Sequence, residues 1–141
     1  MAFPTIAAPF RADHVGSFLR PKFLLEAREQ FQKGQITRAQ LREVEDRAIR
    51  DIVKFQEDLG LQGITDGEFR RGSYWGRFVE RIDGFAIRPA LLKFRDDSGH
   101  VVDFTAPYAE GKLRRNKPLA LDEFEFVKGI AKAEPKITLP A

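Results

Sequence analysis

The sequence predicts an α/β fold in which helices alternate with short strands, as in a parallel sheet. An amphipathic helix at residues 37–59 is followed directly by a short apolar strand at 61–65. Helical spacing returns at 121–131, and the segment 135–140 begins another strand. The 141 residues, 43% of them hydrophobic, suit a single domain over the whole chain. Because a parallel strand needs neighbours and covering layers, we expect a chain that ends on one to be part of a larger fold.

Local signals set the bounds of the first elements. Residues 5–10 predict a strand, and Pro21 predicts the start of a helix that ends at Gly34. Thr37 and Gln40 form a T-x-x-Q capping box for the long helix, and Gly60 follows its end. The helix carries one apolar stripe made of Leu41, Val44, Ala48, Ile52, Phe55 and Leu59.

The middle of the chain departs from this alternation. Residues 73–82 predict a helix with Trp75 and Phe78 on one face, ended by Gly84. Residues 94–104 predict a β-hairpin around an Asp-Ser-Gly turn. We therefore expect an excursion from the main sheet over about 86–118.

Composition and charge exclude several classes of function. The net charge is +3 and the pI about 9.3, but basic and acidic residues are interleaved, and the one basic cluster, at 114–117, is short. This pattern favours a solvated loop over a nucleic-acid surface. There is no cysteine, no signal-peptide pattern and no apolar segment long enough to span a membrane. We expect a cytoplasmic protein with no membrane or nucleic-acid partner.

Two loops after predicted strands carry candidate binding residues. The first contains His14, Val15, Gly16 and Ser17, which offer polar side chains and a close backbone approach. The second contains Asp66-Gly67-Glu68, whose carboxylates can hold an ammonium group. The alternatives are a tight turn for the first loop and a turn or helix-start carboxylate for the second. If both loops follow parallel strands, they lie on the same rim of the sheet.

A third group, Arg70-Arg71 with Tyr74-Trp75, contains arginines next to aromatic residues. Arg71 and Trp75 are candidate secondary site residues, because arginine and an aromatic ring can hold an anion or a flat ring. The alternative for Trp75 and Phe78 is a place in the core. No Gly-rich phosphate loop, H-E-x-x-H pattern or nucleophile elbow occurs in the sequence.

Three ordered motifs resemble the catalytic domain of the cobalamin-independent methionine synthase family. They are RADHVGSFLRP at 11–21, the helix end at 48–61 followed by TDGEFRR at 65–71, and DGF at 83–85. The resemblance covers most of residues 10–85 and resumes at 136–141. It implies the N-terminal portion of a TIM (β/α)8 barrel, about three βα units with an inserted hairpin.

The resemblance also implies a methyltransferase that moves a methyl group from a methylated folate to the thiol of homocysteine, giving methionine. The loop Val15-Gly16-Ser17, with His14, then holds the amino-acid part of the substrate, and Glu68 binds its amino group. Asp66 stands where methionine synthases usually have histidine. The family's zinc ligands, which include two cysteines, are not among these residues, so no catalytic or metal-binding residue is assigned in this chain.

Two alternatives remain open at this stage. One is a related zinc-dependent thiol alkyltransferase acting on another small thiol, which the Asp66 departure motivates. The other is a non-catalytic, truncated or partner-requiring module. In either case we expect the chain to associate with the remainder of a barrel or with itself, since open strand edges favour pairing.

Overall fold

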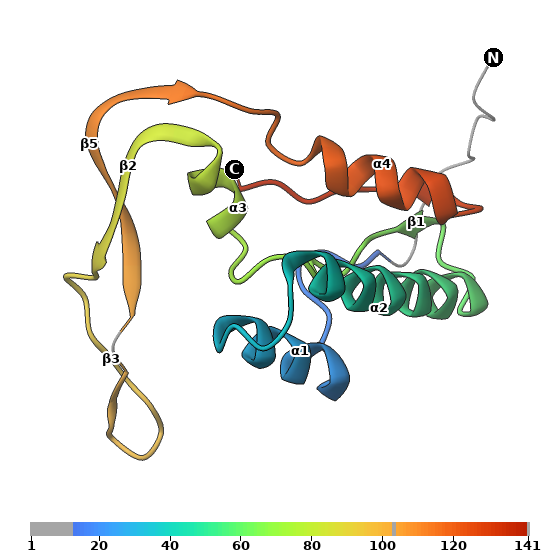
Figure 1. The fold of residues 1–141 in the computed structure, drawn as a ribbon, viewed down its shortest axis with the longest axis horizontal. Helices are drawn as coiled ribbons and strands as arrows, with labels where there is room; N and C mark the ends of the chain where they lie inside the picture. The colour runs from blue at the N-terminus through green and yellow to red at the C-terminus, as the bar shows by residue number, and fades with distance from the viewer. Residues whose placement is uncertain (1–12, 103, 141) are drawn as a thin grey trace.

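The structure, a computed structural model, describes residues 13–102 and 104–140 (Figure 1). The strand expected at 5–10 lies outside these residues. In chain order the elements are α1 (Lys22–Gln32), α2 (Arg38–Asp58), β1 (Gly63–Ile64), α3 (Gly76–Glu80), β2 (Ile82–Pro89), β3 (Phe94–Arg95), β4 (Val101–Val102), β5 (Thr105–Arg115), α4 (Leu121–Ile130) and β6 (Glu134–Pro135).

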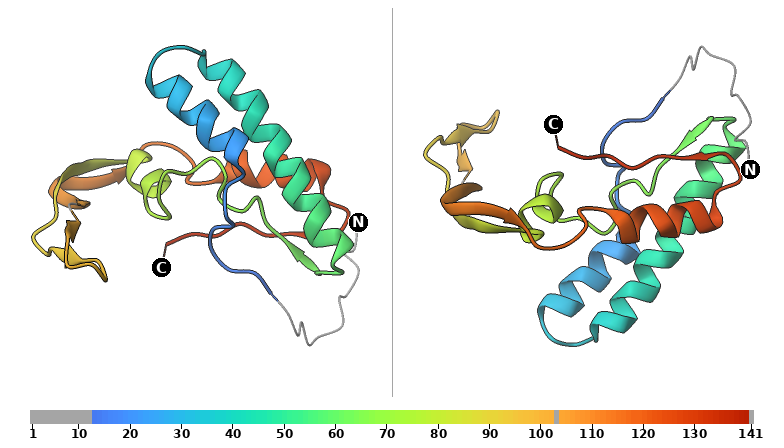
Figure 2. Two further views of the ribbon diagram at one scale, coloured as in Figure 1. Left: turned by 90° about the horizontal axis from the view of Figure 1, so that it is seen from below. Right: turned by 90° about the horizontal axis from the view of Figure 1, so that it is seen from above.

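The predicted capping box sets the start of α2. The Thr37 hydroxyl accepts a hydrogen bond from the Gln40 backbone N–H at 3.2 Å, and the Gln40 side chain accepts one from the Thr37 N–H at 2.8 Å. After the helix, Gly60 adopts φ 76°, the left-handed conformation that ends many helices. The expected helix at 37–59 is therefore confirmed. Figure 2 shows α1 and α2 side by side.

The apolar stripe expected on α2 is wrong towards the helix's C-terminal end. Phe55 and Leu59 are 51% and 63% exposed. There β1 and α4 contact the neighbouring side of the helix, which carries Val53 and Gln56. The buried face of α2 consists of Leu41, Glu45, Ala48, Ile49, Val53 and Gln56.

The parallel pairing expected from the sequence is present between β1 and β6, although β6 shares only Pro135 with the strand expected at 135–140. Gly63 pairs with Glu134, and Ile64 with Pro135. The buried Gln56 side chain extends this sheet edge. Its amide donates to the Thr65 carbonyl at 2.8 Å and accepts from the Thr65 N–H at 3.0 Å. The α/β class is thus confirmed, whereas the closed barrel remains a prediction.

The core lies where α1, α2, α4 and β1 meet. Because β1 ends in this core, the loop that follows it begins against the helices, on the interior side of the fold. The buried cluster comprises Leu24, Ala48, Ile49, Val53, Ile64, Phe69 and Val127.

The helix expected at 73–82 is mostly wrong. The helical part, α3, has five residues, and Ile82 already begins strand β2. Gly84 does not end a helix but sits at an irregularity between Asp83 and Phe85 in β2, with φ 92°. A Cβ at this position would lie 2.8 Å from the Lys112 carbonyl oxygen. Glycine is therefore required by the pairing of β2 with β5, not by a helix end.

The expected excursion is a long antiparallel hairpin, β2–β5, with a small hairpin, β3–β4, near its tip. The predicted hairpin around Asp-Ser-Gly is confirmed in its pairing of Arg95 with Val101. The hairpin extends away from the helices (Figure 1), so it does not cover the sheet. Arg114 and Arg115 are exposed as expected, but they end strand β5 and do not form a loop.

Replacing Thr37 with alanine is expected to lower the free energy of unfolding by about 1 kcal/mol. The change removes the side-chain acceptor for the Gln40 N–H at the start of α2. Urea denaturation of the two proteins measures the difference. Thr37→Ser keeps the acceptor and should retain most of the stability. An equal loss in the serine and alanine variants would contradict the capping explanation.

Candidate functional site

The two candidate loops meet at the C-terminal side of β1. The Phe18 backbone N–H donates to the Gly67 carbonyl at 3.2 Å, which ties the loop at 13–17 to the loop at 65–68. A Cβ on Gly67 would lie 3.1 Å from the Phe18 ring, so glycine permits the close approach. Gly16 and Gly67 have φ 91° and 64°. The structure therefore places the two loops together at this end of β1, as the sequence predicts.

Glu68 has a backbone conformation that is rare for a side chain with a Cβ. Its φ is 57°, and it is the only non-glycine residue with positive φ among those described. The Asp66 carboxylate accepts the Glu68 N–H at 2.9 Å, and Arg20 donates to the Glu68 carbonyl at 3.3 Å. Such a conformation persists only where surrounding contacts fix it, and it is enriched at functional sites.

The Glu68 carboxylate is held by two hydroxyl donors from distant segments. Ser17 donates to Oε2 at 2.6 Å, and Thr138 donates to Oε1 at 2.7 Å. Burial alone would raise the pKa of Glu68, but the bonds from Ser17 and Thr138, with the charges of Arg71 and Arg20, lower it on balance. Glu68 therefore presents an ionised carboxylate at neutral pH.

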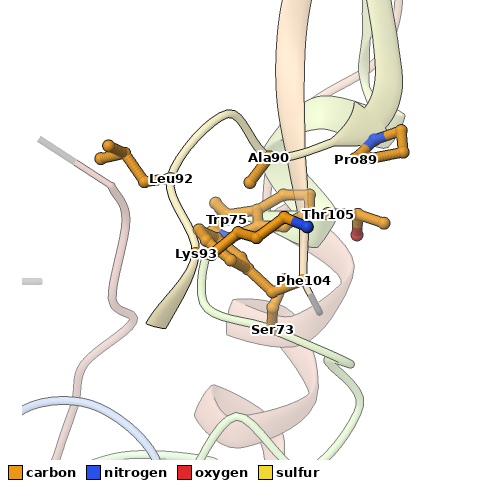
Figure 3. Close-up of a pocket in the computed structure, with 8 residues that line it drawn as sticks. All are labelled: Ser73, Trp75, Pro89, Ala90, Leu92, Lys93, Phe104 and Thr105. Carbon is orange, nitrogen blue, oxygen red and sulfur yellow. The ribbon is translucent and has the colours of Figure 1, made fainter. Parts of the chain in front are cut away.

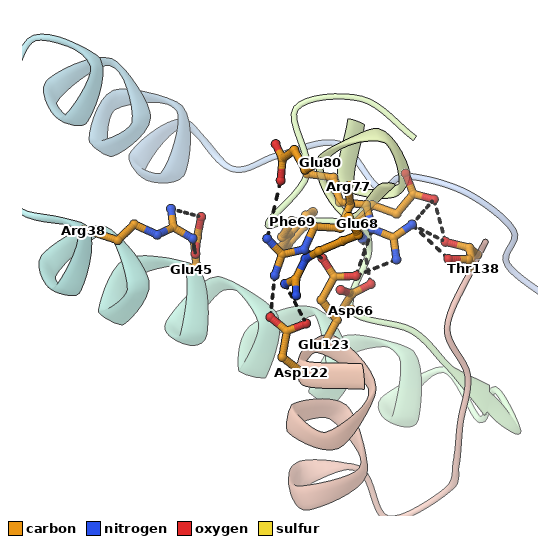
Figure 4. A network of polar contacts seen from close by, with 12 residues as sticks. Arg38, Glu45, Asp66, Glu68, Phe69, Arg77, Glu80, Asp122, Glu123 and Thr138 are labelled. Atoms are coloured by element: carbon orange, nitrogen blue, oxygen red, sulfur yellow. Dashed lines mark hydrogen bonds and ion pairs between the residues drawn. The ribbon is translucent and has the colours of Figure 1, made fainter. Parts of the chain in front are cut away.

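Arg71 connects this carboxylate to the rest of the fold. Its guanidinium pairs with Glu123 of α4 at 2.6 Å and donates to the Thr138 carbonyl at 3.0 Å. Its Nη1 lies 3.8 Å from a Glu68 oxygen. Figure 4 shows Glu68, Glu123 and Thr138 gathered from three segments of the chain. The network fixes Thr138, and Thr138 in turn fixes Glu68.

A cavity of about 220 Å³ opens over Glu68. It combines the Glu68 carboxylate and the Arg71 guanidinium, which is paired with Glu123, with backbone from the first loop, an aromatic ring and aliphatic side chains. This arrangement suits a small molecule that has an ammonium group at one end and an apolar part at the other. The cavity is lined by Val15, Gly16, Glu68, Arg71, Tyr74, Thr138, Leu139 and Pro140.

The structure brings together most, but not all, of the residues expected at the site. Val15, Gly16 and Glu68 line the cavity directly, and Ser17 contacts it through Glu68. His14 does not line it; the His14 ring stacks on Phe18 at 3.6 Å, and its Nε2 lies 3.1 Å from the Gly16 carbonyl. Their role in substrate binding remains a prediction.

The three secondary candidates have different positions. Asp66 is buried and supports the Glu68 backbone, so it does not offer its carboxylate to the cavity. Arg71 lines the cavity, with its guanidinium paired to Glu123. Trp75 precedes α3 and lines a different cavity beside the hairpin, so it is neither part of this site nor part of the core cluster.

Sequence reasoning missed Thr138, Glu123 and Arg20. Thr138 and Glu123 lie 70 and 52 residues from the partners they bind, Glu68 and Arg71, and no local pattern marks such pairs. Arg20 lies within the first motif, but its contact with the Glu68 carbonyl likewise joins residues that are 48 positions apart. Tyr74, one of the aromatic residues expected beside the arginines, does line the cavity.

The described residues do not fit the zinc ion that the resemblance implies. Residues 13–102 and 104–140 contain no group of three or more His, Cys, Asp or Glu side chains that could hold a metal. The chain has no cysteine, so it lacks thiolate donors of the expected kind.

Among residues 13–102 and 104–140, none of the helices has the length and apolar character needed to span a bilayer.

Replacing Asp66 with asparagine is expected to raise the free energy of unfolding near neutral pH. Burial, with a further contribution from the charge of Glu123, raises the pKa of Asp66. The folded-state pKa of Asp66 lies above its ordinary, unfolded-state pKa. The free energy of unfolding therefore falls as the pH rises from the ordinary pKa through the folded-state pKa. Asparagine retains the acceptor for the Glu68 N–H. In urea denaturation the gain should shrink below the ordinary aspartate range, and a gain that grows on acidification would contradict this explanation.

Comparisons with known proteins give one consistent family. The model described as the catalytic domain of cobalamin-independent synthase matches residues 10–123. YxjH of Bacillus subtilis is 38% identical over 95% of this chain and 36% of its own length. A methionine synthase of Sulfolobus acidocaldarius is 30% identical over 83% of this chain and 33% of its own length.

A solved structure shares the fold. It is a protein from Listeria monocytogenes described as a vitamin-B12-independent methionine synthase. The TM-score is 0.71 at 34% identity, and the match covers 97% of this chain and 38% of the other. The chain thus spans little more than a third of the length of the relatives it matches.

Proposed function

Because the chain belongs to the family of the cobalamin-independent synthase catalytic domain, we propose that it supplies the amino-acid end of a homocysteine pocket in a methionine synthase. The family is one of methyltransferases, and its named members include methionine synthases. The transfer of a methyl group from a methylated folate to homocysteine is proposed for the complete family enzyme, and this chain spans about a third of the length of its relative YxjH.

One observation carries the proposal: the ionised Glu68 carboxylate faces a small cavity beside the first loop. An ammonium group placed there completes a charge-assisted hydrogen bond with a carboxylate that the fold already holds in place. Positioning the amino acid in this way also orients the sulfur at its other end, which is how binding energy accelerates a transfer between two substrates.

The apolar side of the cavity suits the sulfur-bearing part of the substrate. Tyr74, Val15 and Leu139 line it. A sulfur atom near an aromatic ring makes a modest favourable contact. Asp66 does not line the cavity, so its departure from the usual histidine leaves unchanged what the cavity offers to homocysteine.

In the proposed reaction the thiol loses its proton and its sulfur gains the methyl group, while the donor's bond to that methyl breaks. Zinc supplies a lowered thiol pKa in the family that the chain resembles. The described residues do not hold the donors for that ion, so the role proposed for this chain is binding and orientation. We also propose that it works with the remainder of a barrel.

Calorimetric titration with homocysteine and with its analogue lacking the amino group tests this proposal. Because the analogue cannot pair with Glu68, we expect it to bind on the order of 10- to 100-fold more weakly, as for the loss of one charged hydrogen bond. An analogue lacking the carboxylate but keeping the ammonium serves as the matched comparison and should keep the Glu68 contact. Equal affinity for homocysteine and the deaminated thiol would contradict the proposal.

A further inference from the structure

A second and larger cavity lies beside the hairpin, at the end of the β2–β5 ladder where Pro89 pairs with Thr105. Its volume is about 700 Å³, and it shares no lining residue with the cavity over Glu68. Ser73 and Trp75 line it, whereas Tyr74 between them lines the Glu68 cavity. The short segment before α3 therefore separates two distinct cavities.

Aromatic side chains form much of the wall of this hairpin cavity. Trp75 comes from the segment before α3, and Phe104 comes from the hairpin, immediately before β5 (Figure 3). Phe104 is 41% exposed, and Trp75 is only partly buried. The Ala90 N–H donates to the Phe104 carbonyl at 2.9 Å, which fixes the backbone on that side. A flat apolar group between these rings would bury aromatic surface that the fold leaves accessible.

The polar groups at the hairpin cavity favour an anion. Lys93 lines it, and among residues 13–102 and 104–140 no partner pairs with the Lys93 ammonium. None of the lining residues is acidic. The Ser73 oxygen accepts the Gly76 N–H at 3.0 Å, which leaves its hydroxyl proton available to donate. Thr105 adds a second hydroxyl.

We infer that the hairpin cavity is a binding site for a small acid with a flat aromatic body. The ring lies between Trp75 and Phe104, and the acid group pairs with Lys93. The inference does not rest on the function proposed for Glu68, since the two cavities have no lining residue in common.

The single tryptophan of the chain makes this inference directly testable. Trp75 is that residue, so a ligand in the hairpin cavity changes the only indole fluorescence of the protein. The 141-residue chain is titrated with phenylpropanoate and with its neutral match, phenylpropanamide. We expect saturable changes with both ligands, and binding of the acid on the order of threefold tighter, the size expected for an exposed charge pair.

Variants identify the groups responsible. Lys93→Gln should make the acid and the amide bind alike, whereas Lys112→Gln, a change to an exposed lysine of β5 outside the cavity, should keep the threefold preference. Phe104→Leu should weaken both ligands, and Glu68→Gln should affect neither. The inference is overturned if phenylpropanoate gives no saturable change, if the wild type binds both ligands equally, or if Lys112→Gln abolishes the preference as Lys93→Gln does.

Discussion

Replacing Arg71 with methionine is expected to lower the free energy of unfolding by about 3–5 kcal/mol. Arg71 is the closest cation to Glu123, whose side chain is 0% exposed, and the next, Arg77, lies 3.7 Å away. The change leaves a buried carboxylate without its main partner and frees the Thr138 carbonyl. A loss of this size is a large share of the stability of a small domain.

Urea denaturation measures this loss, and two further variants test whether the buried ion pair is its cause. Combining Arg71→Met with Glu123→Leu removes the stranded charge and should restore much of the stability. Lys54→Ala breaks an ion pair between Lys54 and Asp58, whose side chains are 74% and 62% exposed respectively. This change should cost less than about 1 kcal/mol, as is usual for ion pairs on the surface. Similar small losses for Arg71→Met and Lys54→Ala would contradict a structural role for the buried network.

Replacing Glu68 with glutamine is expected to weaken homocysteine binding on the order of 10- to 100-fold, the cost of losing a hydrogen bond between charged groups. Glutamine has a similar shape and can still bond to Ser17 and Thr138, whose hydroxyls accept as well as donate. Stability should therefore change little. Glu125→Gln, a change to an exposed carboxylate of α4, is the matched control and should leave the affinity unchanged.

The pH dependence of binding provides a second measure of the same group. Since the hydroxyl bonds and nearby arginines outweigh burial and lower the pKa of Glu68, the ammonium contact should persist below the ordinary glutamate range. Affinity should fall only as the pH passes through the lowered pKa and Glu68 becomes protonated. In Glu68→Gln this acid-side loss should be absent. A loss of the same size in the variant would assign the titration to another group.

Local signals in the sequence predicted the elements that local contacts determine. The Thr37–Gln40 box and Gly60 define α2 because each acts within one turn of the helix end. The parallel strands were predicted from short apolar segments next to helices, and Gln56 then shows how a two-residue strand is stabilised from a helix.

Contacts between distant residues explain what the sequence did not predict. Residues 82–89 form a strand because β5 pairs with them, and this pairing ends at Ile82 the helical spacing that α3 keeps through Phe78 and Val79. The motif at 65–71 points to Glu68, but one of the two hydroxyl groups that hold its carboxylate belongs to Thr138, near the other end of the chain. Trp75 lines the cavity beside the hairpin and does not line the cavity over Glu68.

A crystal structure of the chain soaked with homocysteine would show whether Glu68 holds the substrate's amino group. We expect the ligand in the cavity over Glu68, with its ammonium nitrogen within hydrogen-bond distance of the Glu68 carboxylate and its sulfur on the side of Tyr74. Homocysteine bound elsewhere, or bound there with its ammonium group away from Glu68, would contradict the proposed pocket.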